Sequence, residues 1–378
     1  MLSETPMEGK RIIIAVTNDL VVDQRVHRTA ASLVQQGANV LVIGRQLPGS
    51  QDTGSRPYRI RRMRLLLRKG PLFYACFNFR LFLLLLFRKA DLLLSNDLDT
   101  LLACFLASRI KGWPLVYDSH EYFTEVPELA GRKCARNTWK RIEKRLLPRL
   151  RFSYTVSRSV ANAYRELYGI EMEVIRNLPL TEREEPRRPD LLECGPQRII
   201  IYQGALNVGR GLELMISAMQ YLDNYQLQIY GEGDLSAQLR QLSGELKLDD
   251  RITFLGRIPP EELKEHTRQA SLGISLEEDM GLSYRYSLPN KLFDYIHAGI
   301  PVLVSDLPEM KKVVEDYSIG QVLNEREPEN LAKQVKDMMD SDELRMEWKK
   351  NLRKASSDLC WENEEGKLSD LFRKALYG

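Results

Sequence analysis

The chain is poor in cysteine and histidine, and what it lacks excludes several classes of protein. Its five cysteines are scattered over 378 residues, and no two of them form a CxxC pair. This pattern argues against a zinc site or a disulfide framework and suits a reducing compartment. No long apolar run precedes a cleavage site near the start of the sequence, so we expect no signal peptide and a cytoplasmic protein.

Motifs for nucleic-acid binding are also missing, although one half of the chain is basic. Residues 1–190 carry 32 Lys/Arg against 20 Asp/Glu, whereas the remainder carries 23 against 32. A basic half beside an acidic half predicts two domains with different partners. Without an RNP-like segment, a zinc finger or a clear helix-turn-helix, the basic charge favours anionic lipid or a phosphorylated acceptor over nucleic acid.

Two series of apolar runs alternate with helical segments and predict two parallel α/β domains. The first series opens with RIIIAVT at 11–17 and NVLVIG at 39–44, and the second opens with RIIIYQ at 198–203. Residues 177–197 separate them and hold four prolines and many charges, as a linker does. We therefore expect two Rossmann-like, doubly wound parallel sheets.

Glycine-bearing loops follow three strands of the second half. They are GALNVGRG at 204–211, GEG at 231–233 and the loop around Gly281. Small residues let backbone N–H groups approach a phosphate, and Arg210 can pair with it. A tight βα turn needs glycine anyway, so each loop alone is weak evidence. Together, at the carboxyl ends of one sheet, they predict a diphosphate site.

The stretch 273–305 predicts a strand, an acidic loop, a helix and a second strand. The helix is expected to start near Pro289 and to end near Gly299, which is the usual asymmetry of proline and glycine. Its N-terminus follows a loop at the carboxyl end of a strand, where open α/β sheets bind phosphorylated ligands. The alternative is an ordinary βα unit.

Polar residues also follow the strands of the first half. His120 comes directly after the strand at 114–118, beside a carboxylate, and is either functional or a structural loop histidine. The loop after the first strand has no GxGxxG, so it is not a dinucleotide fingerprint. Asp97-x-Asp99 imitates the metal-binding DxD of some sugar transferases, but capping of the following helix explains it better. We expect no metal.

Residues 59–89 hold nine Lys/Arg and no acid, and the segment 72–87 within them is strongly apolar. That segment is interrupted by Arg80 and is too short to span a membrane. It is either a buried helix on the sheet or a helix at a membrane-facing edge that meets anionic lipid. The flanking cations are Arg68, Lys69, Arg88 and Lys89.

Taken together, these motifs resemble those of the retaining glycosyltransferases of family 4. The most specific is SLPNKLFDYIHAGIPV at 287–302, which is similar to the family's Pro-x-Lys-x-x-Glu…Gly-x-Pro-Val helix. Supporting segments are 174–177, 204–211, 230–233, 254–256 and 361–362. The resemblance implies the GT-B architecture, in which two Rossmann-like domains face a central cleft.

The resemblance also implies what each domain does. Residues 1–180 would bind the acceptor and residues 181–357 the nucleotide-sugar donor, while a last helix over about 358–378 packs back on the first domain. The implied acceptor-side residues are Asn18, Asp19, Arg25 and His120. The implied donor-binding residues are Gly204, Arg210, Gly231, Gly233, Arg257, Ile258, Gly281, Leu282, Asn290, Lys291 and Asp294. The implied catalytic residues are His120, Arg210, Glu277, Glu278 and Lys291.

Three positions depart from the family pattern. Asp294 stands where the second Glu of an E-x7-E motif grips the donor ribose, but Tyr286 stands where the first Glu belongs. That role would pass to Glu277 or Glu278. A diphosphate-binding Arg is replaced by Ala205, and Lys291 or Arg285 would compensate for it.

The activity that the resemblance implies is transfer of a hexose-type sugar, with retention, from a nucleotide-diphosphate sugar to a glycan or lipid-linked acceptor. Such a reaction serves cell-surface polysaccharide or glycolipid synthesis and needs no cofactor or metal. The alternatives are a nucleotide-sugar epimerase on the same fold and a catalytically weakened nucleotide-sugar-binding partner. We expect the basic N-terminal domain to contact the inner face of an anionic membrane peripherally.

Overall fold

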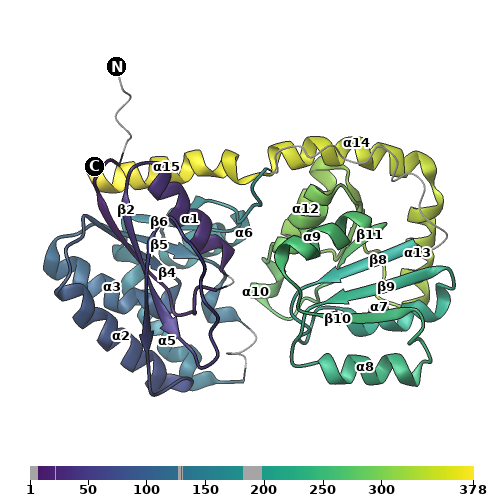
Figure 1. Cartoon of the computed structure of the whole chain (residues 1–378), viewed down its shortest axis with the longest axis horizontal. Helices are drawn as coiled ribbons and strands as arrows, with labels where there is room; N and C mark the ends of the chain where they lie inside the picture. The colour runs from purple at the N-terminus through teal and green to yellow at the C-terminus, as the bar shows by residue number, and fades with distance from the viewer. Residues whose placement is uncertain (1–6, 22, 127–128, 130, 182–197) are drawn as a thin grey trace. The chain divides into compact units, whose positions relative to one another are not determined.

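The computed structural model describes residues 7–21, 23–126, 129, 131–181 and 198–378 (Figure 1). The chain divides into two compact units. Unit 1 is Met1–Asn177 with Glu364–Gly378, and unit 2 is Leu178–Asn363. Each unit holds one parallel sheet flanked by helices, which confirms the predicted α/β class. Most of the predicted linker, 182–197, lies outside the described residues.

The sheet of unit 1 has seven parallel strands in the order β3-β2-β1-β4-β5-β6-β7. They are β1 (Arg11–Ala15), β2 (Asn39–Gln46), β3 (Arg59–Arg64), β4 (Leu92–Asn96), β5 (Leu115–Ser119), β6 (Phe152–Thr155) and β7 (Glu173–Val174). β4 and β5 are buried throughout, which is why their sequences begin as unbroken apolar runs. The strand order reverses between β1 and β4, and ligands of such sheets bind beyond the carboxyl ends at this point.

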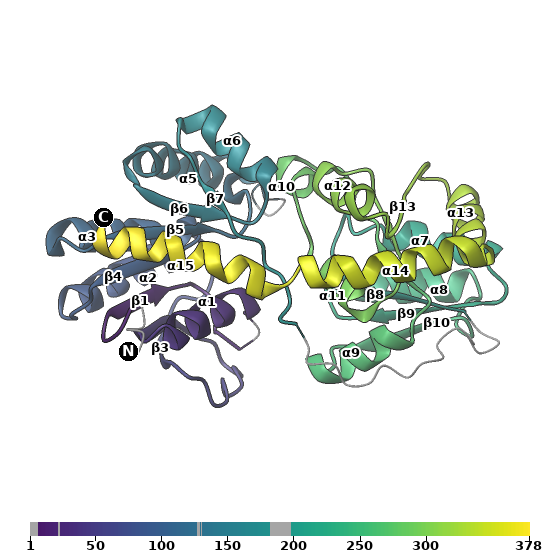
Figure 2. The same cartoon turned by 90° about the horizontal axis from the view of Figure 1, so that it is seen from above.

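Helices cover both faces of this sheet. They are α1 (Gln24–Gln35), α2 (Gly70–Leu86), α3 (Leu98–Lys111), α5 (Lys133–Leu146), α6 (Arg158–Tyr168) and α15 (Trp361–Tyr377), with short 3-10 turns at Phe123–Glu125 and Leu147–Arg149. α2, α3 and α5 pack side by side on one face, and α1 and α15 lie on the other (Figures 1 and 2). Within unit 1, α15 buries Leu368 and Phe372, and its Glu364 carboxylate accepts a hydrogen bond from the Arg176 N–H at 3.2 Å.

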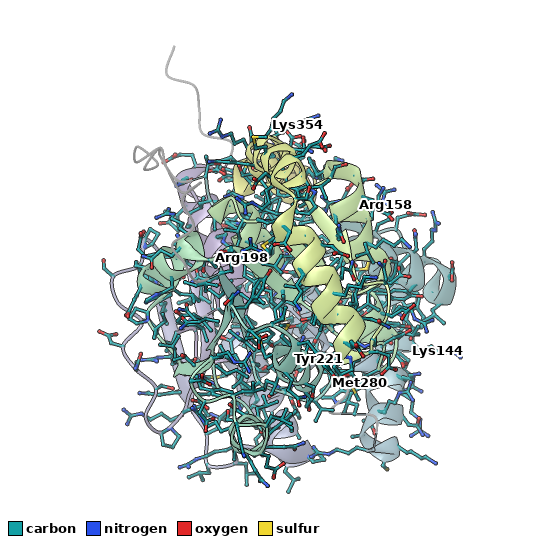
Figure 3. The ribbon with its side chains drawn as sticks, turned by 90° about the vertical axis from the view of Figure 1, so that its right-hand side faces the viewer. Lys144, Arg158, Arg198, Tyr221, Met280 and Lys354 are labelled. Carbon is teal, nitrogen blue, oxygen red and sulfur yellow. The ribbon has the colours of Figure 1, made fainter. Side chains whose placement is uncertain are left out.

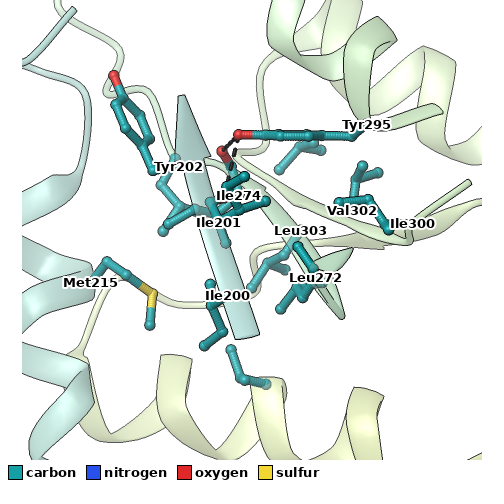
Figure 4. Packing of buried hydrophobic residues seen from close by; sticks show 14 of the residues in the cluster. Ile200, Ile201, Tyr202, Met215, Leu272, Ile274, Tyr295, Ile300, Val302 and Leu303 are labelled. Atoms are coloured by element: carbon teal, nitrogen blue, oxygen red, sulfur yellow. Dashed lines mark hydrogen bonds between the residues drawn. The ribbon is translucent and has the colours of Figure 1, made fainter. Parts of the chain in front are cut away.

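The sheet of unit 2 has six parallel strands in the order β10-β9-β8-β11-β12-β13, which reverses between β8 and β11. They are β8 (Arg198–Gln203), β9 (Tyr225–Tyr230), β10 (Ile252–Gly256), β11 (Leu272–Ser275), β12 (Val302–Val304) and β13 (Gly320–Val322). The helices are α7 (Leu212–Ala218), α8 (Ser236–Glu245), α9 (Pro260–Gln269), α10 (Leu282–Arg285), α11 (Asn290–Ala298), α12 (Pro308–Tyr317), α13 (Pro328–Asp340) and α14 (Asp342–Asp358), with a 3-10 turn at Met219–Tyr221. Ile200, Leu272 and Leu303 from adjacent strands form the centre of its core (Figure 4).

Three local features differ from the expectations. β3, with the sequence RIRRMR, was not predicted because four of its six residues are Arg. It is an edge strand, where charge is tolerated and discourages pairing with other chains. The three-residue β13 was also not predicted. The sequence also predicts a basic helix over 137–151, but α5 covers Lys133–Leu146 and ends before Pro148, which cannot continue it.

Candidate functional site

The carboxyl edge of the unit 2 sheet brings the loop after β8 close to the start of α11. Gly204, directly after β8, has a φ of 140°, which favours glycine. A Cβ atom there would lie 3.4 Å from the Tyr202 hydroxyl oxygen and 4.0 Å from Lys291 Nζ. The glycine loop therefore faces the predicted lysine where the strand order reverses.

Gly231 and Gly233 allow loops of this edge to pack on one another. A Cβ on Gly231 would overlap the Gly204 carbonyl oxygen, and one on Gly233 would lie 2.5 Å from the carbonyl oxygen of Leu206. The Gly231 N–H donates to the Gly256 carbonyl oxygen at 2.7 Å. Backbone packing alone therefore accounts for these two glycines.

Lys291 and Glu277 form a buried ion pair between α11 and the loop after β11. Lys291 Nζ lies 2.8 Å from Glu277 Oε1, and the two side chains are 7% and 0% exposed. The ammonium also lies 3.9 Å from the centre of the Tyr202 ring, a cation–π contact. The Ser275 hydroxyl donates to the other carboxylate oxygen at 2.7 Å. A cation is thus held where little water screens it.

Arg210 adds a second cation to the same carboxylate. Its Nη1 lies 3.7 Å from Glu277 Oε1, and its guanidinium lies 4.9 Å from the centre of the Tyr284 ring. Burial raises the pKa of Glu277, but Lys291, Ser275 and Arg210 outweigh burial and hold that pKa below its ordinary value. One carboxylate faces two cations, so the cluster has a net positive charge that suits a diphosphate.

Two glycines bring the Arg210 loop against the loop after β11. A Cβ on Gly209 would overlap the side chain of Met280, and one on Gly211 would overlap the Leu276 carbonyl. Met280, labelled in Figure 3, is 46% exposed. The close approach of the two loops fixes the backbone of Arg210.

Tyr295 fixes α11 on the sheet. Its ring lies against Gly273, where any Cβ would overlap it. Its hydroxyl oxygen accepts from the Gln203 N–H at 3.2 Å and lies 3.3 Å from the carbonyl oxygens of Ile201 and Ile274 (Figure 4). The start of α11 therefore has a fixed position relative to β8 and β11.

Asp294 lies on α11 one turn after Lys291, so both residues lie on the same side of the helix. The Gln203 amide donates to Asp294 Oδ2 at 2.7 Å, and the Gln203 amide oxygen accepts from the Thr267 hydroxyl at 3.0 Å. The predicted ribose-binding carboxylate is thus oriented by the last residue of β8.

Glu278 differs from Glu277 because it is 46% exposed and lies 3.8 Å from Arg326 Nη2. Arg326 donates to the Leu276 carbonyl oxygen at 2.9 Å and to the Ser305 hydroxyl at 3.1 Å. Sequence reasoning did not single out Arg326, because no motif marks the loop after β13. It is a further cation at this edge, and it supports the backbone that carries both glutamates.

Ala205 leaves one cation fewer than the resemblance would provide, and the two expected replacements lie in different surroundings. Arg285 forms an ion pair with Asp279 at 2.6 Å, and both side chains are substantially exposed. Lys291 is buried beside Glu277. Of the two replacements, Lys291 belongs to the charged cluster.

The other predicted donor residues differ in how far they are exposed. Arg257, Gly281 and Asn290 are exposed, whereas Ile258 and Leu282 are half-buried. A Cβ on Gly281 would meet no atom of the described residues within 4 Å, so its φ of 130°, rather than a close contact, favours glycine there.

The carboxyl edge of the unit 1 sheet holds His120 between two carboxylates. Its Nε2 lies 3.0 Å from Asp118 Oδ2, and its Nδ1 lies 3.3 Å from Asp97 Oδ2. Burial lowers the pKa of His120, but Asp97 and Asp118 outweigh burial and raise that pKa to about 10. The imidazole is therefore a charged hydrogen-bond donor at neutral pH.

Arg25 holds Asp118 from the other side. Its Nε and Nη2 donate to the two oxygens of Asp118 at 2.9 and 2.6 Å, and its Nη1 donates to the Ile175 carbonyl oxygen at 2.9 Å. Burial raises the pKa of Asp118, but Arg25 and His120 outweigh it and lower that pKa to about 2. Arg25 is 4% exposed, so it positions the His120 partner rather than facing solvent.

Asp97 does not cap α3 through its side chain, so the predicted capping explanation is wrong for this residue. It occupies the N-cap with a φ of 57° and makes no side-chain cap hydrogen bond. Its carboxylate accepts a hydrogen bond from the backbone N–H of His120 at 2.9 Å instead.

Asp99 is buried and hydrogen-bonded to Thr17, and burial, followed by the charge of Asp97, raises the pKa of Asp99 to about 7. No cluster of three or more His, Cys, Asp or Glu suits a metal ion within the described part of the chain.

The loop after β1 holds Asn18 and Asp19 in local hydrogen bonds. Asn18 Oδ1 accepts from the Leu20 N–H at 3.0 Å, and its amide contacts the carboxylate of Asp23. Asp19 Oδ2 accepts from the Ser50 hydroxyl at 3.0 Å. These bonds give the predicted acceptor loop a defined shape.

Among curated proteins, the chain is similar to an alpha-D-kanosaminyltransferase from Streptomyces kanamyceticus, with 24% identity over 258 residues. That match covers 64% of this chain and 65% of the relative. It also resembles an amylovoran biosynthesis glycosyltransferase, AmsK, from Erwinia amylovora, at 25% identity over 35% of this chain and 34% of that protein. The chain thus spans less than two thirds of the length of the curated relatives it matches.

Solved structures share the fold over almost the whole chain. A sucrose-phosphate synthase from Thermosynechococcus elongatus superposes with a TM-score of 0.78 and 18% identity, over 97% of this chain and 98% of that one. Anabaena HepE in complex with UDP and glucose gives a TM-score of 0.74 and 16% identity, over 96% and 99% of the two chains.

Two family models match the two halves of the chain. Residues 22–179 match the model described as Glycosyltransferase Family 4, and residues 184–355 match the model described as Glycosyl transferases group 1. The chain therefore belongs to the group 1, family 4 glycosyltransferases.

Proposed function

We propose that this chain is a retaining glycosyltransferase that moves a hexose-type sugar from a nucleotide-diphosphate sugar to a glycan or lipid-linked acceptor. The observation that carries the proposal is the buried Lys291 ammonium, 2.8 Å from Glu277, at the switch point of the unit 2 sheet. The family to which the chain belongs supports glycosyl transfer as the reaction. The fold shared with HepE, a protein solved with UDP and glucose, supports a nucleotide-sugar donor.

The unit 2 cluster has the groups that a donor diphosphate needs. Lys291 and Arg210 supply positive charge, and Gly204 places no side chain beside the ammonium. The N-terminal end of α11 adds the positive end of a helix dipole. Glu277 orients both cations while no donor is bound. Asp294, one turn along α11, is our proposed partner for the ribose hydroxyls.

The proposed reaction requires stabilisation of charge rather than a protein nucleophile. The bond between the anomeric carbon and the β-phosphate oxygen breaks, and the acceptor hydroxyl oxygen bonds to the same carbon on the same face. The acceptor proton passes to the leaving phosphate oxygen. Lys291 and Arg210 stabilise the negative charge that grows on the diphosphate. We propose that these cations let the step proceed without a metal ion.

His120 is proposed to lie beside the transferred sugar as a fixed cation rather than to act as a base. Its pKa of about 10 keeps the imidazole protonated at neutral pH, so it cannot accept a proton there. With Asp97 and Asp118 beside it, the ring has a fixed orientation. The loop of Asn18 and Asp19 is our proposed acceptor contact.

The proposal is tested by donor binding and transfer. A panel of nucleotide sugars is screened for thermal stabilisation, and the stabilising donor is then incubated with candidate glycan and lipid-linked acceptors. We expect transfer with retained anomeric configuration, measured by NMR of the product. Lys291→Met should abolish donor stabilisation, and Arg285→Met, at an exposed ion pair at the end of α10, should preserve it. Inverted product would contradict the proposed mechanism.

Incubation with donor alone separates the alternatives. A transferase should give at most slow hydrolysis, whereas an epimerase would convert the sugar without any acceptor. Donor stabilisation without transfer to any acceptor would indicate a weakened binding partner instead.

A further inference from the structure

α2 is apolar over most of its circumference, although only one side of it is buried. The buried residues are Phe73, Phe77, Leu81 and Leu85. A helix that is apolar on all sides normally lies entirely in a core. Here the other side is open, and its exposed residues are Leu72, Phe79, Leu83 and Phe87, at 67%, 64%, 38% and 87%.

α3 continues this apolar surface. Leu102, Leu106 and Ile110 recur every four residues along it and are 38%, 43% and 64% exposed. α2 and α3 lie side by side (Figures 1 and 2), and the Lys111 ammonium donates to the Leu86 carbonyl oxygen at 3.2 Å. With Leu66 and Leu67 of the loop before α2, at 100% and 41% exposure, these residues form what we call the α2–α3 surface.

Cations surround the α2–α3 surface. They are all exposed and comprise Arg64, Arg68, Lys69, Arg80, Arg88, Lys89, Arg109 and Lys111. Acids are almost missing here, because residues 59–113 contain only Asp91, Asp97 and Asp99. Asp91 pairs with Arg11, Asp97 contacts His120, and Asp99 is buried. Within residues 59–113, the surface therefore combines exposed apolar side chains with an excess of positive charge.

We infer that unit 1 docks on anionic lipid bilayers through the α2–α3 surface. The apolar side chains would enter the boundary between headgroups and acyl chains, and the surrounding cations would meet anionic headgroups. The same charge disfavours a second copy of the chain as occupant, because two such surfaces facing each other would bring like charges together. No helix in the described part of the chain is long and apolar enough to cross a membrane.

The inference is tested by flotation of the whole chain with vesicles, without any nucleotide sugar. Wild type should bind vesicles that contain phosphatidylglycerol, should bind phosphatidylcholine vesicles weakly, and should dissociate as salt is raised. A cation variant carries Arg68→Gln, Lys69→Gln, Arg88→Gln and Lys89→Gln. Each removed charge should weaken binding to the anionic vesicles about fivefold.

An apolar variant carries Leu72→Ser, Phe79→Ser, Leu83→Ser and Phe87→Ser, and should bind at least about tenfold more weakly. The matched control carries Leu167→Ser, Tyr221→Ser and Met346→Ser, at apolar residues outside the α2–α3 surface. These side chains are 57%, 43% and 58% exposed, and the control should bind vesicles as wild type does. All variants alter exposed side chains, and thermal unfolding verifies that each remains folded.

Three outcomes would overturn the inference: no binding by wild type, binding equally reduced in the control, or a dimer that the apolar variant dissociates. Because binding is measured without donor, its failure is distinct from failure of the proposed transfer.

Discussion

Lys291→Met tests the buried ion pair at the centre of the proposed donor site. The substitution removes the ammonium and keeps most of the side-chain volume, so Glu277 loses the partner that lies 2.8 Å away. Leaving one charge of a buried pair uncompensated costs about 3–5 kcal/mol. Arg210, 3.7 Å from the same oxygen, compensates in part, so we expect a loss near the lower limit, about 3 kcal/mol. That loss corresponds to a fall in melting temperature of roughly 6–12 °C for a unit of this size.

The loss should depend on pH in a specific direction. In wild type the pKa of Glu277 lies below its ordinary 4.5, because Lys291, Ser275 and Arg210 outweigh burial. A depressed pKa stabilises the fold above the unfolded pKa, and this contribution is lost as the pH falls through the folded pKa. Without Lys291, burial should raise the pKa of Glu277, so the loss of stability relative to wild type should be largest at about pH 8 and smaller near about pH 5.

The assay is urea unfolding at both pH values, with nucleotide-sugar affinity measured by calorimetry. Arg285→Met is the matched control, because its ion pair with Asp279 is exposed and should contribute little. The double variant Lys291→Met, Glu277→Gln should recover much of the stability but none of the donor affinity. A stability loss in Lys291→Met no larger than that of the control, or equal at both pH values, would contradict the role given to the buried ion pair.

Three further predictions concern the rest of the site. Asp294→Ala should weaken donor binding roughly 10–100-fold with little change in fold, measured by calorimetry, and unchanged affinity would remove it from the ribose site. Dialysis against EDTA should leave the transfer rate unchanged, and a loss restored by manganese would implicate Asp97 and Asp99. His120 has a pKa raised from 6.5 to about 10, so its contribution to stability should be complete below about pH 6.5 and lost as the pH rises through about 10. His120→Gln should flatten that decline in thermal unfolding, and an unaltered profile would contradict the assignment.

Local sequence rules predicted the elements that carry the proposed site. The helix expected between Pro289 and Gly299 is α11, with Pro289 as its N-cap and Gly299 as a left-handed C-cap. Proline and glycine act on their own backbone, so no tertiary information is needed to place them. Buried parallel strands can likewise be predicted from apolar runs in the sequence, as at β8.

Contacts between distant segments were outside the reach of such rules. Arg25 and Asp118 are 93 residues apart, and only the sheet order of β1, β4 and β5 brings them together. Asp97 had the residue type of an N-cap, but a histidine from the next βα loop competes for its carboxylate. Arg326 follows a strand of three residues that no pattern marks. Each case depends on the neighbouring strand rather than on the residue's own segment.

Because the last helix belongs mostly to unit 1, synthesis of unit 1 ends after synthesis of unit 2. Unit 1 consists of Met1–Asn177 and Glu364–Gly378, with all of unit 2 between them. During synthesis, the ribosome therefore finishes unit 2 before it supplies Leu368 and Phe372, which unit 1 buries. A premature stop codon after residue 363 would keep all of unit 2 but would remove residues 364–378 from unit 1. We therefore expect truncations near the C-terminus to destabilise chiefly unit 1, although most of that unit is synthesised first.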